Sequence, residues 1–143
     1  MSLERQVKIA AYSEISNLSP SGYAEGEAEI TEEGANGTLS LSDGELVLKY
    51  EVKTENGCVA TEITLGGDGM RVKRCGEVSS DFLFKEGFEH KSLYSVGPYS
   101  FDTVIRTRKI RANLTETGGR VDVYYDMKIG GADKYVKMKI TAE

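Results

Sequence analysis

The stretch LSLSDGELVLKYEVKTENGCVATEITLGGDGMRVKRCG, residues 39–76, decides the fold. Runs in which apolar and polar residues alternate are separated by short pairs that contain glycine. Alternation with a period of two is typical of strands that bury one face, and Asn-Gly or Asp-Gly between such runs is a strong hairpin signal. The stretch therefore predicts consecutive antiparallel strands joined by tight turns.

The registers of the predicted hairpins can be tested against one another. Each turn fixes which residues lie opposite each other, and a slip by one residue would move every apolar side chain to the other face. All three turns place apolar residues on one common face, which predicts a long antiparallel meander. The predicted partners are Leu41–Leu46 and Leu39–Leu48 across Asp43-Gly44, Tyr50–Ile63 and Leu48–Leu65 across Asn56-Gly57, and Ile63–Val72 and Thr61–Arg74 across Gly67-Asp68.

The C-terminal half continues the same pattern. We predict a turn at Gly118-Gly119, with Val123 opposite Leu114, and a four-residue loop over residues 130–133, with Met127 opposite Val136. The segment before them, residues 99–114, is too long for an ordinary strand, and its apolar positions change parity near Arg108. A β-bulge there explains the change and lets a sheet curl and close.

These features predict an all-β fold, an antiparallel meander of about ten strands that closes into a β-barrel. Closure removes exposed strand edges, which otherwise promote aggregation. A sandwich of two sheets is the alternative. The 143 residues fit one domain, residues 1–143.

Composition restricts the classes of function. The formal net charge of -5 disfavours nucleic acid as a partner, and the sequence has no apolar run long enough to span a membrane and no signal peptide. Cys58 and Cys75 lie in no metal-binding spacing, so we expect reduced thiols in a cytoplasmic protein. No motif predicts a cofactor or a metal, since GGDG at residues 66–69 is a turn with no helix after it.

Several polar residues are predicted to lie on the inner face of the barrel. The hairpin registers place Arg74 there, beside Met70 and Val72. His90, Ser92 and Tyr94 share the face of their strand that also carries Phe88 and Val96. Three interpretations are open: a satisfied buried network, a site for a carboxylate or phosphate, or a catalytic group. The last lacks an acidic residue to orient His90.

Two charged stretches have simpler explanations. Arg106, Arg108, Lys109 and Arg111 form either a solvated strand face or a patch for an anionic partner, RNA included, although the stretch has no interleaved aromatic residue for base stacking. The acidic residues lack the spacing of a calcium-binding loop, so we predict a solvated strand face for them. These residues are Glu25, Glu27, Glu29, Glu32 and Glu33.

Residues 74–101, RCGEVSSDFLFKEGFEHKSLYSVGPYSF, resemble the signature region of the YwiB-like family of small bacterial proteins of unknown function. The resemblance covers roughly residues 25–143. This sequence departs from the family pattern at two places: one residue is inserted before Pro98, and Ser100 stands where glycine is common in the family. The matching positions are Arg74, Gly76, Val78, Phe84, Gly87, His90, Ser92, Tyr94, Pro98 and Tyr99. The resemblance implies a lipocalin-like, or calycin, β-barrel and implies no activity.

The sequence therefore favours a non-catalytic cytoplasmic barrel that binds a small anionic molecule. Arg74 would pair with the anion, His90, Ser92 and Tyr94 would orient it, and Tyr99 would line the rim. The alternative is a structural or interaction module with a filled barrel, in which the basic residues 106–111 contact protein or RNA. An enzyme is the third hypothesis.

Overall fold

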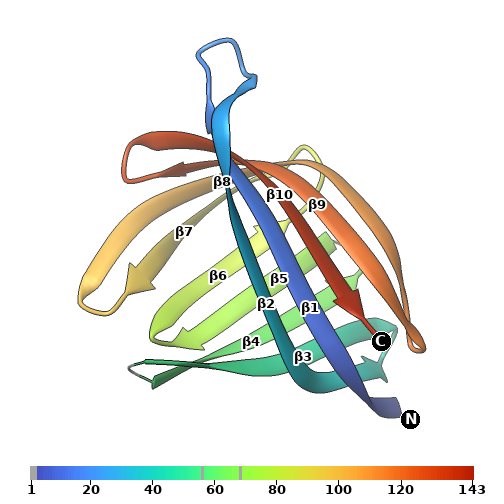
Figure 1. The fold of residues 1–143 in the computed structure, drawn as a ribbon. Helices are drawn as coiled ribbons and strands as arrows, with labels where there is room; N and C mark the ends of the chain where they lie inside the picture. The colour runs from blue at the N-terminus through green and yellow to red at the C-terminus, as the bar shows by residue number, and fades with distance from the viewer. Residues whose placement is uncertain (1–2, 56, 68) are drawn as a thin grey trace.

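The computed structural model describes residues 3–55, 57–67 and 69–143, and these form ten antiparallel strands (Figure 1). Each strand pairs with its sequence neighbours, and the first pairs with the last. The strands are β1 (Leu3–Leu18), β2 (Ala24–Ser42), β3 (Glu45–Thr54), β4 (Gly57–Gly66), β5 (Gly69–Gly76), β6 (Val78–Phe84), β7 (Glu89–Val96), β8 (Tyr99–Thr115), β9 (Gly118–Ile129) and β10 (Ala132–Ala142).

Pairing of β1 with β10 closes the sheet into a barrel, which confirms the predicted fold class and excludes the sandwich. The ladder runs from Ile9 opposite Ala142 to Asn17 opposite Lys134. Both chain ends lie at one end of the barrel, and the turns that follow β3, β5, β7 and β9 lie at the other, which we call the mouth end (Figure 1). The hairpin between β1 and β2 projects beyond the barrel wall.

Two of the predicted turns have the predicted register. Leu41 lies opposite Leu46 across the turn at Asp43-Gly44, and both turn residues have positive φ, as this tight hairpin requires. Across the turn between β4 and β5, Thr61 lies opposite Arg74. Asp68 in that turn is outside the described residues, but the pairing of Gly66 with Gly69 on either side of it is as predicted.

The register predicted across the turn between β3 and β4 is wrong by two residues. Tyr50 lies opposite Thr61 rather than Ile63, and Leu48 lies opposite Ile63 rather than Leu65. The reason is that Gly57 is a strand residue paired with Thr54, so it does not occupy the centre of the turn. The other half of the predicted turn, Asn56, lies outside the described residues. Because the error is two residues, each side chain keeps its predicted face.

The two C-terminal hairpins also differ from their predicted registers by even numbers of residues. Gly118 pairs with Thr115 and Gly119 with Leu114, so the turn is formed by residues 116 and 117, and Val123 lies opposite Ile110. Gly119 belongs to the strand, where a side chain would overlap the carbonyl oxygen of Asn113. Residues 130 and 131 alone form the next turn, both with positive φ, and this places Val136 opposite Tyr125.

The predicted bulge is confirmed at Arg108. Thr107 lies opposite Tyr125 and Lys109 lies opposite Tyr124, so no residue of β9 lies directly opposite Arg108 in the ladder. The bulge turns Ile105 and Leu114, which have different parity along the strand, toward the same interior. Both side chains are buried in one hydrophobic core with Leu39, Ile63 and Val123. No helix among the described residues is long and apolar enough to cross a membrane.

Two glycines of β2 allow a matched test of interior packing. A Cβ on Gly37 would overlap the carbonyl oxygen of Lys49 and lie 2.6 Å from Ile9 Cδ1, whereas a Cβ on Gly34 would meet only the carbonyl oxygen of Ile9 at 3.8 Å. We expect Gly37→Ala to lower the free energy of unfolding by about 2 kcal/mol. Gly34→Ala should change it by less than about 0.5 kcal/mol. Urea unfolding measures both, and equal effects of the two substitutions would contradict this packing.

Candidate functional site

The barrel encloses a cavity of about 390 Å³ that is lined by residues from β1, β2, β5, β6, β7, β9 and β10. Its apolar wall includes Val72, Phe82, Phe84 and Met138, which are all buried. The cavity also touches Thr31 and Glu32, which are exposed, so it reaches the solvent beside β2. A concave, mostly apolar space of this size with a few polar groups is the usual form of a small-molecule site.

A row of polar side chains crosses the inner face on consecutive strands. Tyr50 lies opposite Thr61, Thr61 opposite Arg74, and Arg74 opposite Ser80. Residues directly opposite in an antiparallel pair point to the same side of the sheet. The register therefore collects two hydroxyls, a phenol and a guanidinium at one level of the barrel, and Arg74 and Ser80 line the cavity.

Arg74 is the cation of this row, and its guanidinium is incompletely paired. Its Nε is buried and has no hydrogen-bond partner, and the residue forms no ion pair with any described residue. Burying a charged group without a partner costs free energy. Tyr94, two residues from the end of β7, lines the same cavity, and its ring stacks on that of Phe82 with centroids 6.3 Å apart.

Two phenols of the interior stay protonated far above neutral pH. Burial, together with the nearby charge of Glu33, raises the pKa of Tyr50 to about 12, although Arg74 acts in the opposite direction. The Tyr50 hydroxyl donates a hydrogen bond to Glu33 Oε1 at 2.9 Å. Burial also raises the pKa of Tyr125 to about 12, again against the influence of Arg74. Both phenols can therefore donate hydrogen bonds at neutral pH.

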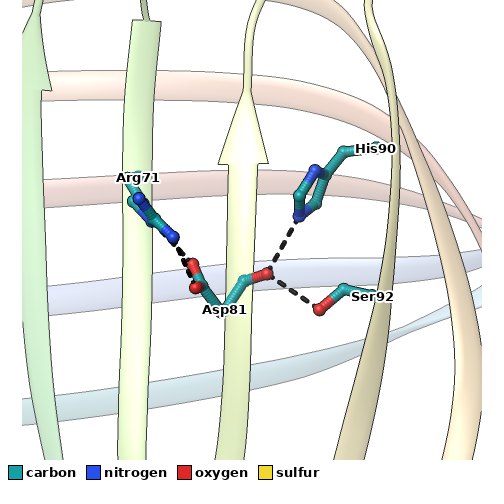
Figure 2. Close-up of polar contacts among 4 residues, drawn as sticks. All are labelled: Arg71, Asp81, His90 and Ser92. Atoms are coloured by element: carbon teal, nitrogen blue, oxygen red, sulfur yellow. Dashed lines mark hydrogen bonds and ion pairs between the residues drawn. The ribbon is translucent and has the colours of Figure 1, made fainter.

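His90 and Ser92 lie away from the cavity, between β6 and β7. His90 Nε2 is 3.1 Å from the carbonyl oxygen of Asp81 and donates to it, because a carbonyl can only accept. Ser92 Oγ donates to the same oxygen at 2.9 Å. Figure 2 shows both side chains reaching across from β7 to β6, while Arg71 binds the Asp81 carboxylate from β5. The hydrogen bonds from Arg71 hold the pKa of Asp81 below its ordinary value.

This arrangement compensates for a short ladder. β6 and β7 pair only at Val78 with Val96 and at Ser79 with Ser95. Beyond these pairs the strands separate, and Asp81 would otherwise have no donor from β7 for its carbonyl. Of the five residues predicted to bind or border a ligand, Arg74 and Tyr94 line the cavity, and His90 and Ser92 join the two strands.

Tyr99, the fifth predicted residue, lies on the hairpin between β7 and β8. It pairs with Val96 and is 68% exposed. It is not among the residues that line the cavity, although its strand neighbour Phe101 faces Tyr94 across the hairpin. Phe101 would also contact a Cβ placed on Gly130, so the β7–β8 and β9–β10 hairpins meet at the mouth end.

The three arginines in the basic stretch of β8 lie near carboxylates of adjacent strands. Arg108 forms an ion pair with Asp126 at 2.7 Å, stacks its guanidinium over Tyr135 and donates to the carbonyl oxygen of Gly22. On the neighbouring strands, Arg106 lies opposite Glu89 and Asp126, and Arg111 lies opposite Asp122. Lys109 lies opposite Tyr124 instead. Arg108 is thus paired, whereas Arg106 and Arg111 only lie beside acidic residues of adjacent strands, of which Asp122 binds Arg120.

Glu33 is a member of the site that was assigned to a solvated surface from the sequence. It lies opposite Ala11 on β1, is half-buried and lines the cavity. The sequence does contain a signal for this position. Glu33 lies an even number of residues from Leu39 on the same strand, and the registers place Leu39 inside, so the Glu33 side chain is expected on the same inner face. The same signal, applied to Tyr125 and Ser80, places both inside as well.

The shifted pKa of Tyr50 predicts a pH dependence of stability. Its ordinary pKa is 10.0 and its folded pKa is about 12. The folded protein therefore retains a proton that the unfolded chain loses, and the stability due to this group is present below pH 10.0 and lost as pH rises toward 12. We expect the free energy of unfolding to fall less between about pH 9 and about pH 11 in Tyr50→Phe than in wild type. Parallel curves for the two proteins would contradict this assignment.

The bridge between β6 and β7 predicts a role in stability for Ser92. Ser92→Ala removes one of the two donors to the Asp81 carbonyl and should lower the free energy of unfolding by about 1 kcal/mol. Ser95→Ala, on the same strand, removes only an exposed contact with Ser100 and should change it by less than about 0.5 kcal/mol. Urea unfolding compares them, and a Ser92 effect no larger than that of Ser95 would refute the bridge.

Comparisons with known proteins agree with the fold. The chain is 25% identical over 120 residues to the uncharacterized beta-barrel protein YwiB of Bacillus subtilis (strain 168), which is 83% of this chain and 84% of that protein. The crystal structure of the ywiB protein from Bacillus subtilis matches 98% of this chain and 92% of that chain with a TM-score of 0.83 at 24% identity, which shows a shared fold. Residues 19–141 match the model described as a domain of unknown function (DUF1934). The chain therefore belongs to the DUF1934 family, as the resemblance to YwiB-like proteins predicted.

Proposed function

We propose that the barrel binds a small amphipathic molecule with an anionic group, and that it does so without catalysis. The observation that carries the proposal is the Arg74 guanidinium, whose buried Nε has no partner at the wall of an accessible cavity. Guanidinium groups pair with carboxylates through two parallel hydrogen bonds, which suits an anionic head group. Such a pair would supply the partner that Nε lacks in the free protein.

The position of Arg74 along its strand suggests how the ligand is oriented. Arg74 lies two residues before Gly76 at the mouth end of β5, and Tyr94 lies two residues before the end of β7. Phe84, at the opposite end of β6, lines the cavity and packs against Tyr125 with ring centroids 4.7 Å apart. An apolar body would thus extend along Phe82 and Phe84, with its anionic head beside Arg74.

Two observations favour ligand binding over an interaction module. The module was predicted to have a filled barrel, whereas the barrel contains a cavity of about 390 Å³. The module was also predicted to use the basic stretch of β8, whose arginines face Asp126, Glu89 and Asp122. Catalysis by His90 has no support from its surroundings, because its Nε2 donates to a main-chain carbonyl of β6.

A thermal-shift experiment with Arg74→Met tests the proposal. A ligand present at one hundred times its Kd adds about 2.7 kcal/mol to the free energy of unfolding. For a chain of this length we expect a rise in Tm of about 9 °C with a medium-chain or phenyl-substituted carboxylate. Arg74→Met should abolish this rise, because the ligand loses its charged partner.

The matched control is Lys73→Met, which also removes one positive charge from β5, but at an exposed position on the outer face. It should keep the full shift. Without ligand, Arg74→Met should melt at or above the wild-type Tm, because it replaces an incompletely paired cation with an apolar side chain. A ligand-free Arg74→Met protein that melts much lower than wild type, with no carboxylate raising the wild-type Tm, would assign Arg74 to core structure instead.

A further inference from the structure

The cavity carries a second charged group besides Arg74. Glu33 projects from β2 into the cavity, and its Oε1 is fixed by the hydrogen bond from Tyr50 at 2.9 Å. The adjacent pair Ser13 and Thr31, directly opposite each other on β1 and β2, adds two hydroxyls to the same part of the wall. One side of the cavity is therefore built to accept hydrogen bonds from a donor.

Glu33 and Arg74 line the same cavity from β2 and β5. No ion pair joins them within the described part of the chain, where the ion pairs present have distances of 2.7 to 2.8 Å. Both nevertheless act on the same phenol, because Glu33 raises the pKa of Tyr50 and Arg74 lowers it. The two opposite charges thus lie on different walls of one cavity, near a common group and out of contact with each other.

A ligand with only an anionic head would satisfy Arg74 and leave Glu33 without a cationic partner. A carboxylate that is half-buried beside a bound anion is unfavourable, because like charges repel more strongly where water is excluded. A ligand with both an ammonium and a carboxylate would match the two walls at once. Its ammonium could donate to Glu33 and to the hydroxyls of Ser13 and Thr31, while its carboxylate pairs with Arg74.

We propose that the ligand is a zwitterion of the amino-acid type with a large apolar side chain, held between Glu33 and Arg74. This proposal rests on the proposed function and adds the ammonium group to it. The apolar side chain would lie against Phe82, Phe84 and Met138, which form the buried wall. Unlike rigid aliphatic residues, Met138 can adapt its conformation to the shape of an aromatic or branched group.

Isothermal titration calorimetry with three probes of one skeleton tests the proposal: L-phenylalanine, 3-phenylpropionate and 2-phenylethylamine. We expect wild type to bind L-phenylalanine at least about tenfold more tightly than either of the others, since each of those leaves one charged wall unpaired. Glu33→Gln should weaken L-phenylalanine binding about tenfold. The same substitution should leave 3-phenylpropionate binding unchanged or tighter, because it removes a repelling carboxylate.

Two controls separate binding from folding. Glu33→Gln keeps a carbonyl oxygen that can accept from Tyr50, so its ligand-free Tm should stay within about 2 °C of wild type. Glu62→Gln removes an exposed charge of β4 that lies opposite Lys49 and Lys73 and does not line the cavity, and it should bind all three probes as wild type does.

The outcomes also separate this proposal from the one on which it rests. Equal affinities for L-phenylalanine and 3-phenylpropionate, unaffected by Glu33→Gln but lost in Arg74→Met, would overturn the zwitterion and leave an anion-binding barrel. Tighter binding of 2-phenylethylamine than of the other two probes would overturn both proposals in favour of a cation site at Glu33. No heat with any of the three probes, from folded wild-type protein, would overturn both.

Discussion

Closure of the sheet through β1 and β10 is the constraint on which the rest of the molecule depends. Nine residues of β1, from Ile9 to Asn17, pair with β10, and the strand pairs with β2 on its other side. A closed sheet has no free edge, so alternate residues of every strand must point into a single enclosed space. Polar residues that are distant in sequence, such as Glu33, Arg74 and Tyr125, consequently face one another without any loop to bring them together.

Closure need not be uniform around the barrel, and the β6–β7 junction is its weakest part. Main-chain pairing stops after Ser79 and Ser95, and His90 and Ser92 replace it with side-chain hydrogen bonds to one carbonyl of β6. The segment between β6 and β7, residues 85–88, strengthens this junction because it forms hydrogen bonds with β8. There, Gly87 donates to the Thr107 carbonyl, and the Glu86 carboxylate accepts from the main-chain NH of Ile110 beside the bulge. The bulge at Arg108 is thus the place where the segment between β6 and β7 is attached to β8.

The sequence predicted the faces of the strands well and their registers less well, for one physical reason. Side chains alternate with a period of two, so any shift by an even number of residues leaves the buried face unchanged. Leu48 is buried whether its partner is Leu65, as predicted, or Ile63, as observed. The apolar pattern therefore cannot distinguish registers that differ by two, and only the turn conformation does. Gly118 and Gly119 resembled a turn because glycine also occurs where two backbones approach closely, as Gly119 does with Asn113.

The same reasoning explains which parts of the site were predictable. Arg74 was placed inside by parity, and parity also put His90 and Ser92 on the face of Tyr94. Whether such residues reach a cavity or a neighbouring strand depends on the separation of β6 and β7, which no alternation pattern encodes. Glu33 was missed because five acidic residues close together resemble a solvated strand, although its parity matches that of buried Leu39.

The charge distribution inside the barrel is difficult to explain as a means of stabilising the fold. A guanidinium placed to stabilise the interior would be expected to pair with the nearest carboxylate, since an unpaired partner of a buried ion pair is strongly destabilising. Glu33 is in the same cavity, yet its hydrogen bond comes from Tyr50, and Arg74 Nε has no partner. The core does not depend on either charge, because Leu39, Leu48, Ile63, Val123 and Ile140 form a continuous apolar cluster around the barrel. Two opposite charges that line one cavity from different strands without forming an ion pair are unfavourable for a core and suit a ligand that carries both.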